Sequence, residues 1–252
     1  MKVVGIIPAR YASTRFPGKP LAMIKGKTMI QRVVEQAWKS KLDAVVVATD
    51  DMRIADEVLG FGGQYVLTDP NHRSGTDRCR EALDTLETQY DAVVNIQGDE
   101  PFVNPKQIDL LIDLISRDGI QIASLAKPID DEAELFSPNA VKVVMDNEGK
   151  ALYFSRNPIP FMRNIAQDRW LEEGSFYQHV GIYAYKAEAL RQIARMQPSK
   201  LEIAESLEQL RWLENGLSIH MAVTHAINVS VDTPYDLVKA ELLAKTQTLK
   251  EG

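Results

Sequence analysis

The sequence predicts an α/β fold whose centre is a doubly wound, mostly parallel sheet. Short apolar runs rich in β-branched residues occur at 3–7, 44–48 and 92–96, and each has the length of a strand. Segments with apolar residues at helical spacing separate these runs. Because strands that alternate with helices are joined by right-handed crossovers, we expect them to lie parallel in one sheet.

Capping residues and periodicity predict the elements of the first half of the chain. Pro8 is expected to end the first strand, and Thr28 can cap a helix whose apolar residues run to Trp38. Asp50 and Asp51 open the next helix. The other predicted elements here are the end of that helix at Leu59, a short strand at 64–67, a helix from Ser74 to about Leu86 and a helix from Pro105 to about Ile115.

The pattern changes after a predicted strand at 120–126. Segments 140–145 and 151–154 alternate as strands across Asp146-Asn147-Glu148-Gly149, which predicts a hairpin, and an irregular segment with prolines follows to residue 173. The remaining predicted elements are a strand at 176–185, a helix at 186–196, a helix from the capping box of Ser199 and Glu202 to Asn215, a strand at 218–223 and a helix from Pro234 to about Leu249. We find no repeat or linker, which favours a single domain over 1–252 with an inserted region at about 128–185.

Composition limits the classes of function. The 252 residues are 45% hydrophobic and 25% charged, as in ordinary globular proteins. A net charge of -6 argues against a nucleic-acid partner or an anionic membrane, since both call for a basic surface. Cys79 is the single cysteine, so neither an internal disulfide nor a cysteine-rich zinc site is expected. No signal-peptide core or membrane-spanning stretch is evident, and we expect a cytoplasmic protein.

A basic loop follows the first strand. The stretch GIIPARYASTRFPGKP holds Arg10, Arg15 and Lys19 within ten residues of an otherwise acidic chain. Open α/β sheets bind anionic ligands at the carboxyl ends of their strands, which is where this loop begins. The loop therefore predicts a phosphate site, with a solvated basic loop as the alternative.

Two aspartates are candidates for holding a metal. Asp99 follows the strand at 92–96 in a turn that Gly98 makes tight, and Asp232 lies after an apolar stretch and before the last helix. Mg²⁺ prefers carboxylate oxygens and commonly joins them to substrate phosphates. Each aspartate could instead serve as a turn former or a helix cap.

Two familiar nucleotide motifs are near misses. Gly26-Lys27-Thr28 resembles the end of a Walker A loop, but Leu21 occupies the place of its first glycine. Gly60-Phe61-Gly62-Gly63 lacks the third glycine of a dinucleotide fingerprint and lies between a helix and a strand. We expect the first to start a helix and the second to end one.

A specific resemblance rests on motifs that occur in order along essentially the whole chain. They are GIIPARYASTRFPGKP, HRSGTDR, NIQGDEP, NAVKVV, ALYFSR, HVGIYAY, LEQLR and VDTP. Together they resemble the bacterial 3-deoxy-D-manno-octulosonate (Kdo) cytidylyltransferases, or CMP-Kdo synthetases. Sialic acid cytidylyltransferases also begin with an IPAR-type loop, but are not expected to carry NIQGDEP and HVGIY together.

The resemblance implies a nucleotidyltransferase fold and the transfer of the cytidylyl group of CTP to Kdo, with Mg²⁺, in lipopolysaccharide synthesis. It implies a homodimer formed partly through the hairpin region. The implied catalytic residues are Arg10, Lys19, Asp99 and Asp232, and both aspartates are implied to bind the metal. The implied nucleotide contacts are Pro8, Ala9, Arg10, Arg15, Lys19, Ser74, Gly75, Thr76, Arg78 and Asp99. The implied sugar contacts are Gln97, Arg156, His179, Tyr183, Glu208 and Gln209.

The residue types suit an acidic sugar. One guanidinium, such as that of Arg156, can bind the sugar carboxylate through two hydrogen bonds, and the other side chains offer donors and acceptors to its hydroxyls. The sequence departs from the family in the loop after Arg156 and at Ser230, where many relatives have glycine. Alternatives are a cytidylyltransferase for 8-amino-Kdo or sialic acid, a nucleotide-sugar-dependent glycosyltransferase and a non-catalytic nucleotide sensor.

Overall fold

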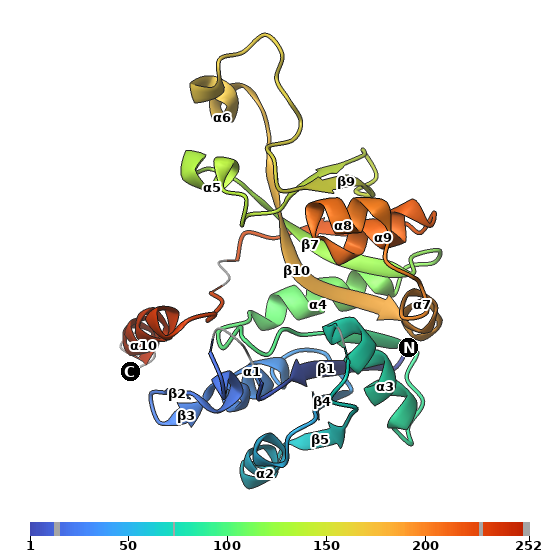
Figure 1. The fold of residues 1–252 in the computed structure, drawn as a ribbon, viewed down its shortest axis with the longest axis vertical. Coiled ribbons are helices and arrows are strands. Elements are labelled where there is room, and N and C mark those ends of the chain that lie inside the picture. Colours follow the sequence, from blue (N-terminus) through green and yellow to red (C-terminus); the bar gives the residue numbers. More distant parts are fainter. Residues whose placement is uncertain (13–15, 73, 227–228, 249–252) are drawn as a thin grey trace. The chain divides into compact units, whose positions relative to one another are not determined.

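The computed structural model describes residues 1–12, 16–72, 74–226 and 229–248 (Figure 1). The chain forms two compact units, which we call unit 1 (Met1–Ile112 with Ile227–Gly252) and unit 2 (Asp113–Ala226). The division falls within α4 (Pro105–Ile115). The expected single domain with an insert at 128–185 stays a prediction.

Unit 1 contains a parallel sheet with the strand order β6-β1-β4-β5. Its strands are β1 (Val3–Ala9), β4 (Ala44–Thr49), β5 (Gln64–Leu67) and β6 (Ala92–Asn95). Val4 pairs with Ala44 of β4 and with Val93 of β6, so β1 has a parallel neighbour on each side. The chain adds β4 and β5 on one side of β1 and then crosses to place β6 on the other. This arrangement confirms the predicted α/β class and its parallel sheet.

The helices of unit 1 begin where their caps predict. Thr28 accepts a hydrogen bond from Gln31 N at 3.2 Å, and Asp51 and Ser74 cap their helices in the same way. The helices are α1 (Met29–Ala37), α2 (Met52–Gly60), α3 (Gly75–Thr85) and α10 (Pro234–Thr248), with α4 at the boundary. Gly26-Lys27-Thr28 thus starts a helix and Gly60 ends one, as expected. The small elements η1 (Lys19–Leu21), β2 (Met23–Ile24) and β3 (Lys27–Thr28) were not predicted.

The expectation that Pro8 ends the first strand is wrong, because β1 continues to Ala9. The pairing of β1 with β6 stops at Ile6, whereas its pairing with β4 continues as Pro8 opposite Ala48. A proline lacks the N–H that a central strand would need on both sides. Pro8 is tolerated because the ladder at this point has a partner on one side within unit 1.

Unit 2 contains both parallel and antiparallel strands. β11 (Ile219–Val223) pairs parallel with β7 (Ile122–Pro128), and β7 pairs antiparallel with β10 (Tyr177–Lys186). β8 (Lys142–Met145) and β9 (Ala151–Ser155) form the predicted hairpin. Its helical elements are α5 (Glu132–Phe136), η2 (Gln167–Arg169), α6 (Trp170–Glu173), α7 (Ala187–Ile193), α8 (Lys200–Glu205) and α9 (Glu208–Glu214).

Two predictions for unit 2 are wrong in detail. The segment expected to be irregular ends in η2 and α6, because Trp170 packs with Phe176, Leu135 and Ile129 in a buried apolar cluster. The helix predicted from the capping box to Asn215 is two helices, since Ser206 adopts a left-handed backbone with a φ of 52°. The capping box of Ser199 and Glu202 itself is present.

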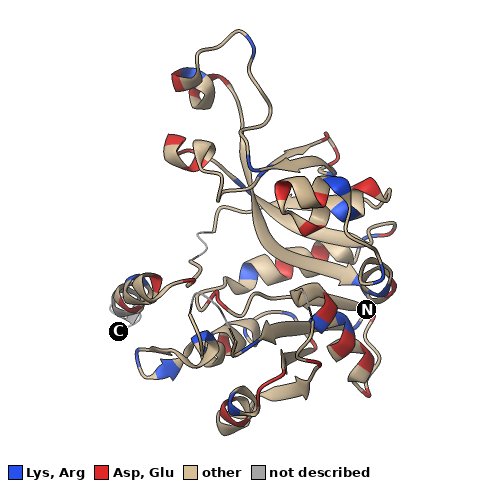
Figure 2. Ribbon diagram, viewed as in Figure 1, with Lys and Arg blue, Asp and Glu red and all other residues tan. Residues whose placement is uncertain are grey.

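Charged residues lie mainly on helices and loops, whereas the strands are largely free of them (Figure 2). This distribution agrees with burial, since Val4, Ile6, Val46 and Val93 are fully or almost fully buried. Strands covered on both faces are expected to be continuous apolar runs. In the described part of the chain, no helix has the length and apolar character needed to cross a membrane.

Candidate active site

A cavity of about 310 Å³ lies at the carboxyl ends of β1 and β6 in unit 1. These two strands are where the strand order reverses, and open α/β sheets bind ligands at that point. The cavity is lined by Pro8, Ala9, Arg10, Lys19, Pro20, His72, Ser74, Gly75, Arg78, Gln97, Gly98, Asp99 and Asp232. Most of the predicted nucleotide residues therefore meet in one cavity, together with Gln97.

The glycine in the 97–99 turn is required by its close approach to β1. A Cβ atom on Gly98 would lie 2.8 Å from the carbonyl oxygen of Pro8, which is closer than real Cβ contacts allow. Because the obstructing atom belongs to the backbone, any side chain here would separate the turn from the end of β1. Gly98 thus allows Asp99 to lie beside the first strand.

Lys19 and the two predicted aspartates form the charged centre of the cavity. Lys19 Nζ lies 2.8 Å from Asp99 Oδ2 and 3.2 Å from Asp232 Oδ1. The side chain of Lys19 is 14% exposed, and those of Asp99 and Asp232 are 28% and 36% exposed. Val231 N also donates to the carbonyl oxygen of Asp99 at 2.9 Å, which joins the segment before α10 to the 97–99 turn. Two carboxylates distant in sequence therefore converge on one point.

This donor set fits Mg²⁺. Two carboxylates that flank one position supply the hard oxygen ligands that Mg²⁺ takes, and this cation keeps several waters and binds substrate phosphates for the remainder. No group of three or more His, Cys, Asp or Glu residues that could enclose a metal occurs among the described residues. Two carboxylates that leave room for a phosphate ligand fit the coordination of Mg²⁺. They do not fit a structural metal site, in which protein side chains supply all the ligands.

The start of α3 forms one wall of the cavity. Ser74 caps this 11-residue helix by accepting a hydrogen bond from Asp77 N at 3.1 Å. A Cβ on Gly75 would lie 3.3 Å from Pro8 Cγ, so a glycine lets the first turn approach β1 closely. The first N–H groups of a helix favour anions. Thr76, another predicted nucleotide contact, is buried in α3 and is not part of the cavity lining.

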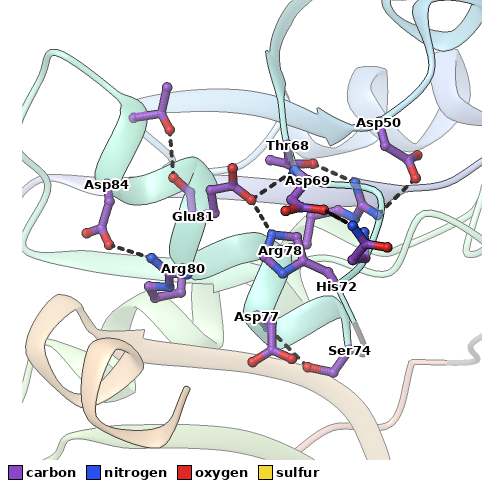
Figure 3. A network of polar contacts seen from close by, with 12 residues as sticks. Asp50, Thr68, Asp69, His72, Ser74, Asp77, Arg78, Arg80, Glu81 and Asp84 are labelled. Atoms are coloured by element: carbon purple, nitrogen blue, oxygen red, sulfur yellow. Dashed lines mark hydrogen bonds and ion pairs between the residues drawn. The ribbon is translucent and has the colours of Figure 1, made fainter. Parts of the chain in front are cut away.

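Arg78 lies one turn further along α3 and is almost fully buried. Its guanidinium donates to Thr68 Oγ1 at 2.5 Å and to Asp50 Oδ2 at 3.3 Å, and Figure 3 shows it between these two residues. A buried guanidinium needs such partners, since an unpaired buried charge is strongly unfavourable. The sequence did not indicate Asp50 or Thr68 as partners, because they lie 28 and 10 residues before Arg78, just after β4 and β5.

His72 also lines the cavity but was not predicted as a site residue. Its Nε2 forms a short contact with Glu81 Oε2 across the start of α3, as Figure 3 shows. The sequence signal that could have identified His72 as a site residue was its position within the HRSGTDR motif. Glu81 on the helix fixes the ring that faces the cavity.

The basic loop is described only in part. Arg10 is exposed at the end of β1 and lines the cavity, whereas Arg15 lies outside the described residues. Tyr11 is held by Arg53, whose guanidinium carbon lies 3.3 Å from the centre of the tyrosine ring. Gly18, with a φ of 71°, donates its N–H to Tyr11 O at 2.9 Å and so closes the loop just before Lys19.

The other predicted sugar residues lie in unit 2, and two of them meet at a bulge in β10. His179 and Tyr183 have ring centroids 5.2 Å apart, although residues four apart in a straight strand are separated by about 13 Å. The register against β7 shifts between Val180 and Tyr183, and this bulge shortens the separation. Bulges are frequent next to active sites because they redirect side chains.

The environments of these two rings suit polar contacts with a ligand. Burial lowers the pKa of His179 to about 3, so its ring is neutral, and its Nε2 lies 3.0 Å from Ser124 Oγ. Burial, and then the nearby Glu208 carboxylate, raise the pKa of Tyr183 well above its ordinary value. The Tyr183 hydroxyl is buried without a hydrogen-bond partner among the described residues. An orphaned buried hydroxyl indicates a polar group that is supplied by a ligand or by water.

Glu208 and Gln209 form the first turn of α9. Figure 1 labels this helix next to α8. Gln209 is buried, whereas Glu208 is partly exposed. Glu208 also lies within ion-pair distance of Arg211 on the same helix. Arg211 lies 3.8 Å from Glu208 but donates to Glu202 at 2.6 and 2.8 Å.

Arg156 follows β9 and is bound to backbone. Its guanidinium donates to the carbonyl oxygens of Glu205 at 2.7 Å, Pro138 at 2.9 Å and Ser206 at 3.2 Å. A guanidinium has five N–H donors, so two remain beyond these three contacts. The residue is partly exposed, and its remaining donors can serve a ligand.

The comparisons with known proteins identify the family. The cytidylyltransferase family model matches residues 4–219. The 3-deoxy-manno-octulosonate cytidylyltransferase of Parabacteroides distasonis is 53% identical over 244 residues, which cover 95% of this chain and 97% of that protein. That of Thermodesulfovibrio yellowstonii is 47% identical and covers 98% of this chain and 99% of its own length. The chain belongs to the 3-deoxy-manno-octulosonate cytidylyltransferases.

Solved structures place this family member in a wider fold group. A CMP:2-keto-3-deoxy-manno-octonic acid synthetase complexed with CTP matches 98% of the chain and 100% of its own, with a TM-score of 0.91 and 41% identity. A 4-diphosphocytidyl-2C-methyl-D-erythritol synthase from Anaerococcus prevotii matches 97% of the chain with a TM-score of 0.61 and 15% identity, which shows a shared fold alone. The predicted nucleotidyltransferase fold and family resemblance are thereby confirmed.

Proposed function

We propose that this protein transfers the cytidylyl group of CTP to Kdo, giving CMP-Kdo and pyrophosphate for lipopolysaccharide synthesis. The observation that carries the proposal is the convergence of Lys19, Asp99 and Asp232 in a cavity at the topological switch point of the sheet. A triphosphate and a divalent cation both require charged groups at such a place. The relatives named above supply the identity of the nucleotide and the sugar.

The reaction is an in-line displacement at phosphorus. The anomeric hydroxyl of Kdo loses its proton to water, and its oxygen forms a new bond to the α-phosphorus of CTP. The bond between the α-phosphorus and the oxygen that bridges to the β-phosphorus breaks, and pyrophosphate leaves with its electron pair. Catalysis of such a transfer consists mainly of positioning and charge stabilisation. Arg10, Lys19 and the N–H groups at the start of α3 bind phosphate oxygens in this proposal, and Arg15 is a further candidate.

Asp99 and Asp232 would hold Mg²⁺. When bound, this cation supplies positive charge to the phosphates and lowers the pKa of the attacking hydroxyl. The chain itself contributes the two carboxylates at one point, with Lys19 between them to reduce their mutual repulsion. Gly98 contributes by letting the Asp99 turn lie against Pro8.

The sugar contacts proposed in unit 2 are of the types that a polyhydroxy acid requires. Arg156 can bind the Kdo carboxylate with its remaining donors. Neutral His179 can donate or accept a hydrogen bond, and so can the buried hydroxyl of Tyr183, which has no partner among the described residues. Glu208 can accept hydrogen bonds from sugar hydroxyls. Gln97 and Gln209 are proposed as further contacts.

Two properties go beyond the reaction. We propose a cytoplasmic location, and we propose a homodimer that uses the region at 128–185. The support for the dimer is apolar exposure in that region, since Phe161 is 70% and Leu152 is 60% exposed. Apolar side chains exposed to this extent are available for contact with a second copy of the chain. Light scattering at micromolar concentration tests it, and a monomer would contradict it.

The function is tested by measuring pyrophosphate release from CTP with purified protein and Mg²⁺. Kdo, 8-amino-Kdo and sialic acid are compared at equal concentration, and EDTA is added to a parallel reaction. We expect release with Kdo at the highest kcat/KM and none after EDTA. A higher kcat/KM with another acid sugar would change the substrate, and no release with any of them would contradict the enzymatic function.

A further inference from the structure

A fully buried lysine lies at the start of β8, outside the sites described above. Lys142 is 0% exposed. Burying an ammonium is unfavourable unless its donors are satisfied. Lys142 Nζ donates to the carbonyl oxygens of Ser137 at 2.8 Å, Ala140 at 2.6 Å and Arg156 at 2.5 Å. An ammonium has three donors, so these three carbonyls match its capacity.

None of the three partners is a carboxylate, which distinguishes this lysine from one in an ion pair. Burial lowers the pKa of Lys142, the Glu205 carboxylate raises it, and the Arg156 guanidinium lowers it. A lysine that only filled space in a core would be better replaced by an apolar residue. Because the Lys142 ammonium instead binds three backbone carbonyl oxygens, we infer that it serves to hold those backbone segments in place.

The backbone that Lys142 binds is the one that carries Arg156. Its other two partners belong to the segment at 137–140, whose Pro138 carbonyl accepts from the Arg156 guanidinium at 2.9 Å. Arg156 N donates in turn to Glu205 Oε2 at 2.9 Å, and Ser155 Oγ donates to Glu205 Oε1 at 2.7 Å. Arg156 is therefore fixed through its main chain at both its N–H and its carbonyl.

Arg156 connects this cluster to the turn between α8 and α9. Its guanidinium binds the carbonyl oxygens of Glu205 and Ser206, and Ser206 has the left-handed φ of 52° that separates the two helices. α9 begins two residues later with Glu208. The position of this helix start therefore depends on contacts that Arg156 makes.

We propose that Lys142 is a positioning residue for acid-sugar binding, because it fixes the backbone of Arg156 and, through Arg156, the turn that starts α9. This inference rests on the proposed function, in which Arg156, Glu208 and Gln209 contact the sugar. Residues that orient others act by keeping them within a small fraction of an ångström of the productive geometry. Lys142 itself need not touch substrate.

The test compares Lys142→Met with Lys127→Met in the full-length protein. Lys127 is the matched control, because it also lies in unit 2 but its ammonium pairs with the Glu134 carboxylate. We expect Lys142→Met to raise the KM for Kdo about 10- to 100-fold and to change the KM for CTP less than about 2-fold. Lys127→Met should leave both constants near those of the wild type.

A double-mutant comparison separates positioning from a general loss of packing. In an Arg156→Ala background, Lys142→Met should change the KM for Kdo by less than about 2-fold, because residues that act through one another are not additive. Additive effects on the KM for Kdo would overturn the inference. An unchanged KM for Kdo in the single variant would also overturn it.

Two further measurements keep the test decisive. If Lys142→Met fails to fold, Glu205→Gln replaces it, since it weakens the contacts to Arg156 N and Ser155 while preserving size, and the same selective rise is expected. Hydrogen exchange of the Arg156 amide should accelerate about tenfold or more in either variant. Unchanged exchange of the Arg156 amide would contradict this inference, whether or not the wild type releases pyrophosphate. A wild-type protein that releases no pyrophosphate would contradict the proposed function instead.

Discussion

Asp99→Asn separates the proposed metal role of Asp99 from a purely structural one. The substitution preserves the size of the side chain and its capacity to accept a hydrogen bond from Lys19. It removes one of the two negative charges that converge on Lys19 Nζ, at 2.8 Å for Asp99 and 3.2 Å for Asp232. The hydrogen bond from Val231 N is retained, because its acceptor is the backbone carbonyl of Asp99.

The two roles predict effects of different size on turnover and stability. A partly exposed ion pair contributes roughly 0.2–1 kcal/mol, so the melting temperature should change by no more than about 4 °C. Loss of a group that stabilises charge in the transition state lowers kcat by about 10²- to 10³-fold, or about 3–4 kcal/mol. We therefore expect a folded protein with very low turnover and a weaker dependence on Mg²⁺.

The measurement combines Mg²⁺-dependent pyrophosphate release with thermal unfolding of the same preparation. Asp91→Asn is the matched control, because its carboxylate accepts a hydrogen bond from Lys2 N at 2.6 Å and lies outside the cavity lining. That variant should retain the turnover of the wild type. Turnover of Asp99→Asn within about 2-fold of the wild type would remove Asp99 from the catalytic group, given the size of effect expected above.

Three further predictions follow from the contacts in each unit. Gly98→Ala should abolish most pyrophosphate release, because a Cβ would lie 2.8 Å from the carbonyl oxygen of Pro8. Gly60→Ala should retain it, because a Cβ there meets no described atom within 4 Å apart from its chain neighbours and its own helix backbone. Equal activities of the two variants would contradict the argument. Arg78→Met should lower the free energy of unfolding by about 3–5 kcal/mol, because it leaves the Asp50 carboxylate without its ion-pair partner. Adding Asp50→Asn to Arg78→Met should restore part of the lost melting temperature but should not restore the KM for CTP. For His179, the folded pKa of about 3 lies below the unfolded value of 6.5, so the unfolded state binds more protons and stability is lost as pH falls from 6.5 towards 3, by roughly 1.4 kcal/mol per pH unit. His179→Gln should flatten this part of the stability profile in urea titrations, and an unchanged slope would show that other groups cause it.

The features predicted correctly from sequence are those that local physics determines. β-branched apolar runs gave the strands of unit 1, and Thr28, Asp51 and Ser74 cap their helices as their side chains allow. The cavity followed from topology, since the carboxyl ends of neighbouring parallel strands must lie together. That rule placed Arg10, Lys19 and Asp99 at one edge.

The features that were missed depend on tertiary partners. The bulge that brings His179 to Tyr183 is a property of the pairing between β10 and β7, and alternation along β10 alone does not reveal it. The break at Ser206 interrupts a segment with good helical spacing, and it is accompanied by contacts from Arg156, which lies 50 residues earlier. Pro8 was expected to end a strand because its pairing with a neighbour on one side could not be foreseen.

The last segment of the chain explains how Asp232 reaches the cavity. After unit 2, residues 229–248 belong again to unit 1, where Val231 is fully buried with Ile24, Met29 and Ala240. Asp236 Oδ2 accepts hydrogen bonds from the N–H groups of Asp232 and Thr233 at 3.3 and 3.0 Å, which fixes the turn before α10. Packing of α10 and this turn therefore position the second carboxylate. The dipeptide Val231-Asp232 places one residue in the core and the next in the cavity, so the stability of the last helix and the geometry of the charged centre depend on the same two residues.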